Sequence, residues 1–249
     1  MKKIYFAVSD IHGCYSDMIK ALDKVGFMKG NSNHILIVVG DAFDRGHEQL
    51  ELFNFFMELE QSNQLIYILG NHDMMLIGMQ SDPSLAVFNY MHNGLDETIH
   101  QIFGVKKMVG MYKYIEQVVQ TNQYKQMRAW LSSKEFYFET EDYIFAHAGL
   151  PDDDDWRKTM NHHDTWIKTW MMLDSSLNEL TGGKFLVCGH WHAYDLRARD
   201  SFLEPDIRNL YNHETYFAKN GTLIALDGCT NYSHLVNVLV IEQEEVLKG

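Results

Sequence analysis

Cysteine and proline are scarce in this sequence of 249 residues, which contains only three of each. Cys14, Cys188 and Cys229 lie far apart and form no C-x-x-C pair. This spacing excludes a disulfide-rich secreted scaffold and predicts reduced thiols. With three prolines, a long proline-rich linker between domains is excluded as well.

Long apolar runs are also missing, and acidic residues outnumber basic ones. The first apolar run, from Ile4 to Val8, ends before Asp10 and is too short for a signal peptide or a membrane helix of about 20 residues. Lys and Arg total 21 against 34 Asp and Glu, so the formal net charge is −13. Such a chain lacks the basic patch that nucleic acids or anionic membranes require. We therefore expect a cytoplasmic protein that binds neither; its oligomeric state is not predicted.

The order of apolar runs and amphipathic stretches predicts an α/β (α+β) fold. Strands are expected at 4–8, 35–39 and 65–69, with helices at 16–25 and 48–59 between them, an order typical of a parallel sheet. Further strands are expected at 136–139, 143–146, 185–188, 222–226 and 237–241. Helical periods dominate between about residues 83 and 133. We predict a single catalytic domain, 1–249, with a helical insert at about 83–133.

Five short polar blocks follow predicted strands. Each combines glycine or another small residue with side chains that can bind metals. In open α/β sheets, ligands bind at the carboxyl ends of the strands, so the five blocks are expected to converge. They are Asp10-Ile11-His12-Gly13, Gly40-Asp41-Ala42-Phe43-Asp44-Arg45-Gly46, Gly70-Asn71-His72-Asp73, His147-Ala148-Gly149 and Gly189-His190-Trp191-His192.

The residue types in these blocks indicate a metal centre that acts on phosphate. Carboxylates and imidazoles together suit Mn, Fe or Zn better than Ca or Mg. Six or seven such groups exceed the need of one metal and fit a pair bridged by a carboxylate. Two metals roughly 3.5–4 Å apart activate water and clamp an in-line phosphoryl displacement. The guanidinium of Arg45 has the geometry to hold phosphate oxygens.

Taken together, the blocks resemble the calcineurin-like metallophosphatase superfamily and, within it, the phosphoprotein phosphatase branch. The segment Asn93–Thr98 resembles the NGG-x-x-T segment of bacterial and bacteriophage lambda-type serine/threonine protein phosphatases, and Asp227-Gly228 resembles their late D-x-G segment. Leu69–Asp73 is also similar to the symmetrical diadenosine tetraphosphatases. The resemblance implies a four-layer α/β/β/α sandwich of two mixed sheets flanked by helices.

The resemblance also implies ligands for two divalent or trivalent metal ions, Mn²⁺ or Fe, with Zn as a further option. Asp10 and His12 would bind the first metal, Asp41 would bridge both, and the second would be held by Asn71, His147 and His190.

The resemblance further implies the catalytic roles. His72 would be the general acid, oriented by Asp44, while Arg45 and Asn71 would bind the phosphoryl group. A hydroxide bridging the metals would attack phosphorus directly, without a covalent enzyme intermediate.

Three positions depart from the family pattern. Ser9 replaces a glycine, and its small size predicts little effect. Lys168 occupies the position of a phosphate-binding arginine, so it keeps the charge but loses the bidentate geometry. Arg157 and Arg197 are alternative cations for that role. His192 follows the late Gly-His pair, as in other branches of the superfamily, and is predicted to be an additional ligand of the first metal.

These residues predict a phosphatase that hydrolyses phosphomonoesters, with phosphoserine or phosphothreonine in a protein or peptide as the first substrate. The alternative is a diadenosine tetraphosphate hydrolase acting on a small phosphoester. Gly70–Asp73 favours that alternative, whereas Asp44, which that family typically lacks, favours the phosphatase. A second alternative is a catalytically silent relative that binds metals and serves as a scaffold.

Overall fold

The computed structural model describes residues 2–105, 110–166, 173–174, 176–201 and 212–244. Two mixed sheets organise these residues. The first has the strand order β3 (Leu65–Ile68), β2 (His34–Val39), β1 (Lys2–Val8), β9 (Leu239–Glu244). The second has the order β4 (Tyr137–Glu139), β5 (Tyr143–Ala146), β6 (Phe185–Cys188), β8 (Leu223–Ala225), β7 (Tyr216–Phe217). The central strands of each sheet are parallel, and β9, β4 and β7 pair antiparallel at the edges.

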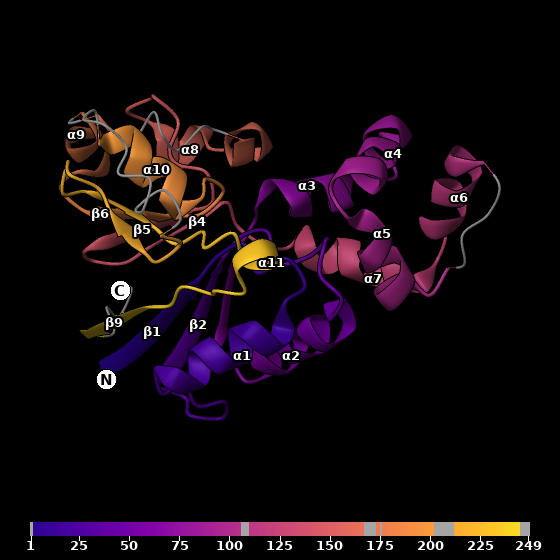
Figure 1. Ribbon diagram of the computed structural model, residues 1–249, viewed down its shortest axis with the longest axis horizontal. Coiled ribbons are helices and arrows are strands. Elements are labelled where there is room, and N and C mark those ends of the chain that lie inside the picture. The colour runs from indigo at the N-terminus through magenta and orange to yellow at the C-terminus, as the bar shows by residue number, and fades with distance from the viewer. Residues whose placement is uncertain (1, 106–109, 167–172, 175, 202–211, 245–249) are drawn as a thin grey trace.

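The sheets face each other between two layers of helices (Figure 1). Helices α1 (Tyr15–Lys24) and α2 (Gln49–Gln61) cover the first sheet, whereas α8 (Trp156–Thr159), α9 (Leu177–Thr181) and α10 (Ala193–Asp200) cover the second. A buried cluster that includes Ile37, Phe145 and Val187 joins the inner faces of the two sheets. The predicted four-layer sandwich is therefore confirmed.

Burial explains why the central strands lack alternation. All six residues of β2 are buried, because one face meets the other sheet and the opposite face meets helices. The helical layers close separate cores. Leu36 and Phe56 belong to the core under α1 and α2, and Trp156 and Leu196 belong to the core under α8 and α10.

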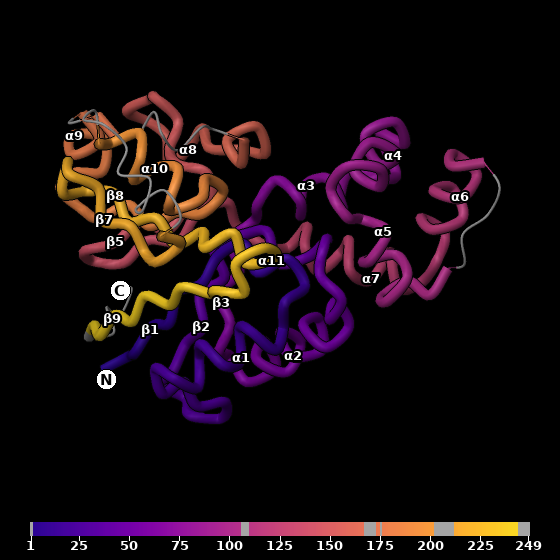
Figure 2. Tube along the Cα trace, in the orientation of Figure 1, coloured from indigo at the N-terminus to yellow at the C-terminus, as the bar shows by residue number. Residues whose placement is uncertain are grey.

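The segment expected to be a helical insert is helical through most of its described part and lies to one side of the sandwich (Figure 2). It contains α4 (Pro83–His92), α5 (Leu95–Thr98), a π-helical turn (Ile99–Phe103), α6 (Met111–Val118) and α7 (Asn122–Leu131). Asp82 caps α4 by accepting hydrogen bonds from the backbone N–H groups of Ser84 and Leu85, each at 3.0 Å. The insert packs on the core of the first sheet through buried side chains such as Tyr114 and Tyr124.

Three short helices complete the described chain: α3 (Asn71–Gly78), a 3₁₀ helix (His162–Trp166) and α11 (Thr230–Ser233). Helix α3 begins shortly after β3, so Gly70 of the third polar block is its N-cap and Asn71, His72 and Asp73 lie in its first turn. Within the described ranges, every helix is too short or too polar to cross a membrane.

Candidate metal centre

The polar blocks lie at the carboxyl ends of β1, β2, β3, β5 and β6, and those after β1, β2 and β6 contain strained backbone. Six of the nine non-glycine residues with positive φ in the described chain belong to these blocks: Asp10, His12, Asp41, Asp44, Arg45 and His190, with φ between 46° and 72°. Such conformations cost free energy, and they cluster at functional sites where the surrounding structure holds them.

The bridging position predicted for Asp41 lies between two groups of side chains. In the group on the second-sheet side, ligand atoms of Asp41, His147 and His190 all lie within 4.8 Å of one another. The Oδ1 atom of Asn71 joins them, 3.1 Å from His147 Nε2 and 2.9 Å from His190 Nδ1. These are the four residues expected to hold the second metal.

Hydrogen bonding to the backbone fixes the orientation of His147. Its Nδ1–H donates to the carbonyl oxygen of Val39 at 2.9 Å. The opposite nitrogen, Nε2, then faces two oxygen acceptors, Asn71 Oδ1 at 3.1 Å and Asp41 Oδ2 at 3.3 Å. Three atoms with lone pairs can meet in this way only around a cation, either a proton or a metal ion. A ring held by a backbone carbonyl is also the usual arrangement of a metal-binding histidine.

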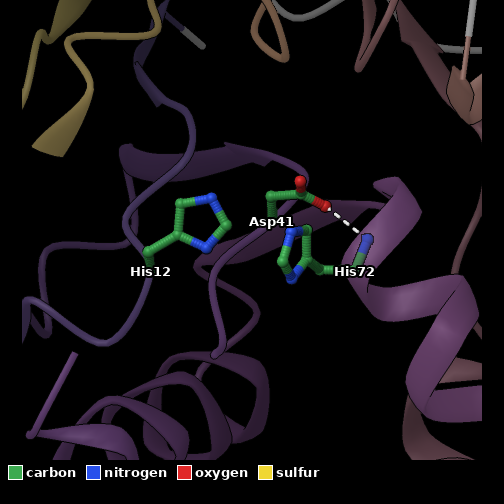
Figure 3. Close-up of side chains that lie close together, drawn as sticks. All are labelled: His12, Asp41 and His72. Carbon is green, nitrogen blue, oxygen red and sulfur yellow. Dashed lines mark hydrogen bonds between the residues drawn. The ribbon is translucent and has the colours of Figure 1, made fainter. Parts of the chain in front are cut away.

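On the other side of Asp41, His12 and His72 form the second group (Figure 3). His12 repeats the pattern of His147, since its Nδ1–H donates to the carbonyl oxygen of Phe43 at 2.9 Å. The rings of His12 and His72 lie edge to face, with centroids 4.7 Å apart. Asp41 Oδ1 accepts a hydrogen bond from the backbone N–H of His72 at 2.9 Å, so Asp41 contacts both groups.

Asp10 lies beside these groups and not within either. Its carboxylate accepts hydrogen bonds from the hydroxyl of Ser9 and from the backbone N–H of His190, the latter at 3.0 Å. Burial raises the pKa of Asp10 to about 8, and the nearby carboxylates of Asp227 and Asp41 contribute to the rise. Ser9 is thus a hydrogen-bond donor to a predicted ligand, a contact that its small size alone did not indicate.

The chemistry of this donor set fits metal ions. Asp10 and Asp41 are buried together, and burial of anions that repel one another is costly without a compensating cation. Burial lowers the pKa of His147, but Asp41 and Asp10 outweigh that effect and raise it to about 10. Burial lowers the pKa of His190 to about 4, which keeps this ring neutral and able to bind a metal. The residues present can therefore hold the divalent metal ions that the resemblance implies.

His72, a member of the second group, is also the predicted acid. Nδ1–H of His72 donates to Asp44 Oδ2 at 2.8 Å, and both side chains are buried. Nη2 of Arg45 lies 3.2 Å from His72 Nε2. Burial lowers the pKa of His72, but Asp41 and Asp44 outweigh it and raise the value. Asp44, Arg45 and His72 are therefore in contact, as a shared catalytic role requires.

The other predicted site residues lie outside the two groups of candidate ligands, or outside the residues that the structure describes. His192 Nδ1 is 2.9 Å from Asp227 Oδ2, and neither group formed by the described residues includes it, so its role as a ligand stays a prediction. Lys168 lies outside the described residues. Of the alternative cations, Arg157 bonds to Glu139, and Arg197 donates to backbone carbonyls of residues 212, 214 and 215.

The sequence also left Asp73 unassigned. Its carboxylate accepts hydrogen bonds from the hydroxyl of Tyr67 at 2.8 Å and from the backbone N–H groups of Gly70 at 2.9 Å and Asp41 at 3.2 Å. Its place inside the third polar block was the only available signal.

The chain is similar to several known proteins, and it spans about half the length of the relatives named here. A bis(5'-nucleosyl)-tetraphosphatase PrpE (asymmetrical) of Halalkalibacterium halodurans is 26% identical over 154 residues, which cover 59% of this chain and 57% of that protein. A symmetrical bis(5'-nucleosyl)-tetraphosphatase of Nitrosomonas europaea is 24% identical over 145 residues, which cover 58% of this chain and 44% of that protein.

The fold is shared with a protein serine/threonine phosphatase from Saccharomyces cerevisiae. Its structure aligns with a TM-score of 0.58 and 14% identity over 99% of this chain and 82% of that one. The sequence model of the calcineurin-like phosphoesterase family matches residues 5–194, which include all five polar blocks. The predicted superfamily is therefore confirmed, and the chain belongs to the calcineurin-like phosphoesterase family.

Proposed function

We propose that the protein is a phosphoesterase that works with two metal ions. The observation that carries the proposal is the position of Asp41, whose carboxylate belongs to both groups of candidate ligands and lies within 4.8 Å of the ligand atoms in each. In this proposal one metal would be held by Asp10, His12 and Asp41, and the other by Asp41, Asn71, His147 and His190. When bound, Mn²⁺ or Fe, or alternatively Zn²⁺, would supply a nucleophilic water and would offset charge on the phosphoryl group.

The remaining residues act on the substrate itself. Arg45 binds the phosphoryl oxygens, because its guanidinium lies beside the acid and offers paired N–H donors. His72 gives a proton from Nε2 to the leaving oxygen, while Asp44 holds the opposite nitrogen. Asn71 both binds the second metal and contacts the phosphoryl group in this proposal.

Dinucleoside polyphosphates are the first substrate class that we propose. Support comes from the two relatives named above, both described as bis(5'-nucleosyl)-tetraphosphatases. These similarities extend over about half of each relative. The substrate would then be a small anion that carries several phosphates.

Phosphomonoesters of serine or threonine are the second candidate class, and the Asp44–His72 pair favours them. The alkoxide that leaves such an ester is strongly basic and needs a proton in the transition state. A leaving nucleoside phosphate needs it far less, because the second pKa of a phosphate group is about 6. A buried acid held by a carboxylate is therefore better explained by an ester with a poor leaving group.

Product analysis separates these classes. The purified protein is loaded with Mn²⁺, Fe²⁺ or Zn²⁺ in turn and given diadenosine tetraphosphate and a phosphoserine peptide side by side. Nucleotide products with an intact peptide would support the first class, and free phosphate from the peptide alone would support the second. Two bound metals without turnover of either compound, or of a simple aryl phosphate, would contradict the enzymatic proposal and support a silent scaffold.

A further inference from the structure

The carboxylate of Asp44 is held on both oxygens by buried side chains. Oδ2 accepts hydrogen bonds from His72 Nδ1 at 2.8 Å and from Asn89 Nδ2 at 3.1 Å. Oδ1 accepts one from the hydroxyl of Thr98 at 2.7 Å. The same hydroxyl oxygen accepts from the backbone N–H of Asp44 at 3.1 Å. Asp44, Asn89 and Thr98 each have no solvent-exposed surface.

Two of these partners come from the helical insert, not from the sandwich. Asn89 lies on α4, and Thr98 is the last residue of α5. The insert also holds the next residue of the block, since the carbonyl oxygen of Gly94 accepts from the backbone N–H of Arg45 at 3.0 Å. Gly94 has a φ of +80°, and a Cβ there would lie 2.5 Å from that same nitrogen. The insert therefore approaches the Asp44–Arg45 turn closely at three points.

The amide of Asn89 is oriented toward Asp44 at the expense of its own carbonyl. Asn89 Oδ1 is buried and has no hydrogen-bond partner among the described residues. A buried acceptor without a partner is destabilising, and such groups in folded proteins call for an explanation. Donation to the carboxylate that holds His72 is that explanation.

We propose that Asn89 and Thr98 are positioning residues through which the helical insert holds Asp44, and thereby His72, in the orientation for proton transfer to the leaving oxygen. This inference rests on the proposed phosphoesterase function. Thr98 fixes the rotation of the carboxylate, because it binds Oδ1 and leaves Oδ2 directed at the imidazole. Asn89 shares Oδ2 with His72 and stops it from turning away. The insert then acts on the chemistry at the sandwich edge through Asp44 and His72.

The test compares Thr98→Val with Thr98→Ser on two aryl phosphates. Phenyl phosphate releases a phenol with a pKa of about 10, similar to tyrosine, and so depends on the acid. 4-Nitrophenyl phosphate releases a far more acidic phenol and depends on it little. Because general acid catalysis is worth about 10²–10⁴ in rate, we expect Thr98→Val to lower kcat on phenyl phosphate about tenfold or more. The nitrophenyl ester should lose less than about twofold, and Thr98→Ser should restore both rates.

Tyr114→Phe is the matched control. Tyr114 is also buried in the insert, and its hydroxyl donates to the carbonyl oxygen of Val105 at 3.0 Å, away from Asp44. This variant loses one buried hydrogen bond of the insert, so it measures the effect of destabilisation alone. It should leave the ratio of the two rates unchanged. An equal loss on both esters in Thr98→Val, with the same loss in Tyr114→Phe, would show a merely structural role and overturn the proposal.

Asn89→Leu supplies a second variant in case Thr98→Val folds poorly. It removes the donor to Asp44 and the unpaired oxygen together, so the unfolding temperature should stay close to that of the parent while the phenyl phosphate rate falls. Retention of the full rate on phenyl phosphate would contradict the role of Asn89.

A readout independent of turnover keeps the inference separate from the proposed function. The Nδ1 proton of His72 is identified in the proton NMR spectrum as the downfield signal that His72→Ala removes. We expect Thr98→Val to shift or broaden this signal and Tyr114→Phe to leave it in place. An unchanged signal in Thr98→Val overturns the positioning role even if no phosphoester is hydrolysed. Absence of turnover in the parent protein with a shifted signal would count against the proposed function only.

Discussion

The hydroxyl of Tyr67 donates to Asp73 Oδ1 at 2.8 Å, and this contact anchors the carboxylate that holds the backbone of Asp41, the residue proposed to bridge the two metals. The other oxygen of Asp73 accepts from the backbone N–H groups of Gly70 and Asp41. Asp73 therefore joins the turn after β2 to the turn after β3. Burial raises the pKa of Asp73 to about 7, and the nearby Asp41 carboxylate adds to the rise.

Substitutions of Tyr67 and Asp73 should both lower stability, but only the change at Asp73 should also weaken metal binding. Tyr67→Phe deletes one hydrogen bond and should lower the free energy of unfolding by about 1 kcal/mol, with metal affinity little changed. Asp73→Ala also strips the acceptor from two backbone donors, so we expect a loss of about 1–3 kcal/mol and weaker metal binding. Urea unfolding and metal titration measure both effects. If Asp73→Ala bound metals as tightly as the parent, Asp73 would have no part in placing Asp41.

Asp41→Asn should abolish activity by weakening both metals. The amide keeps the shape of the side chain but removes the negative charge that both ligand groups share. Metal content of the purified variant and turnover of the best substrate check this expectation. Asp155→Asn, a change in an exposed acid, is the control and should retain both properties. Most of the turnover surviving in Asp41→Asn would refute the bridging role.

His72→Ala should lower kcat by about 10²–10⁴, the range typical for loss of a general acid, while two metals remain bound. The measurement needs metal analysis beside kinetics, because His72 Nδ1 or Nε2 lies within 4.8 Å of ligand atoms of His12 and Asp41. Loss of one metal from the variant would assign His72 to the ligands and remove the acid from the mechanism.

Features of the site that lie at strand ends could be predicted because the chain itself places them. An apolar run such as 35–39 predicts a central strand, and the polar residue that follows it must lie at the carboxyl edge of the sheet. Asp41, Asn71, His147 and His190 were expected to meet for this reason, and the structure brings them together.

Contacts made by the insert could not be predicted in this way. Asn89 is one polar residue on a mostly apolar helix, 45 positions from Asp44, and only the packing of α4 brings it there. His192 was predicted from its spacing to be a metal ligand, and that role stays a prediction. Its Nδ1 atom lies 2.9 Å from Asp227 Oδ2, 35 positions later in the chain, a contact that the spacing did not indicate. Ser9 was judged by size, although its hydroxyl bonds to Asp10.

The glycines at the two ends of α3 should respond in opposite directions to alanine. A Cβ at Gly70 would lie 2.2 Å from Asp41 Oδ1 and 2.7 Å from its backbone nitrogen, both within a rigid turn. We expect Gly70→Ala to lose about 1–3 kcal/mol of stability and to bind metals weakly. A Cβ at Gly78 meets nothing within 4 Å, so Gly78→Ala should stabilise the helix by about 0.5–1 kcal/mol. Thermal unfolding with and without metal distinguishes them, and equal responses would contradict the predicted crowding.

Far from the metal centre, Glu139 should make stability depend on acid pH. Arg157 donates two hydrogen bonds to its carboxylate at 2.7 and 2.9 Å, and Lys184 lies 2.8 Å from Oε1. These cations, Arg157 above all, lower the pKa of Glu139 from 4.5 to about 2. The folded state therefore holds this proton less tightly than the unfolded chain. The resulting stabilisation is complete above the unfolded value of 4.5 and is lost as the pH falls through about 2.

Glu139→Gln tests this dependence, since glutamine keeps the size of the side chain and cannot ionise. At pH 7 the variant should be less stable than the parent by about 1 kcal/mol, because the pair is partly exposed and screened. Urea unfolding at pH 7, 5, 4 and 3 should show that difference narrowing below pH 4.5, as the parent loses its advantage. Glu58→Gln, which breaks an exposed pair with Lys29, is the control, and its effect should be smaller at pH 7. A constant difference between Glu139→Gln and the parent down to pH 3 would mean that the charge of Glu139 contributes nothing and that its hydrogen bonds alone stabilise the contact between α8 and the second sheet.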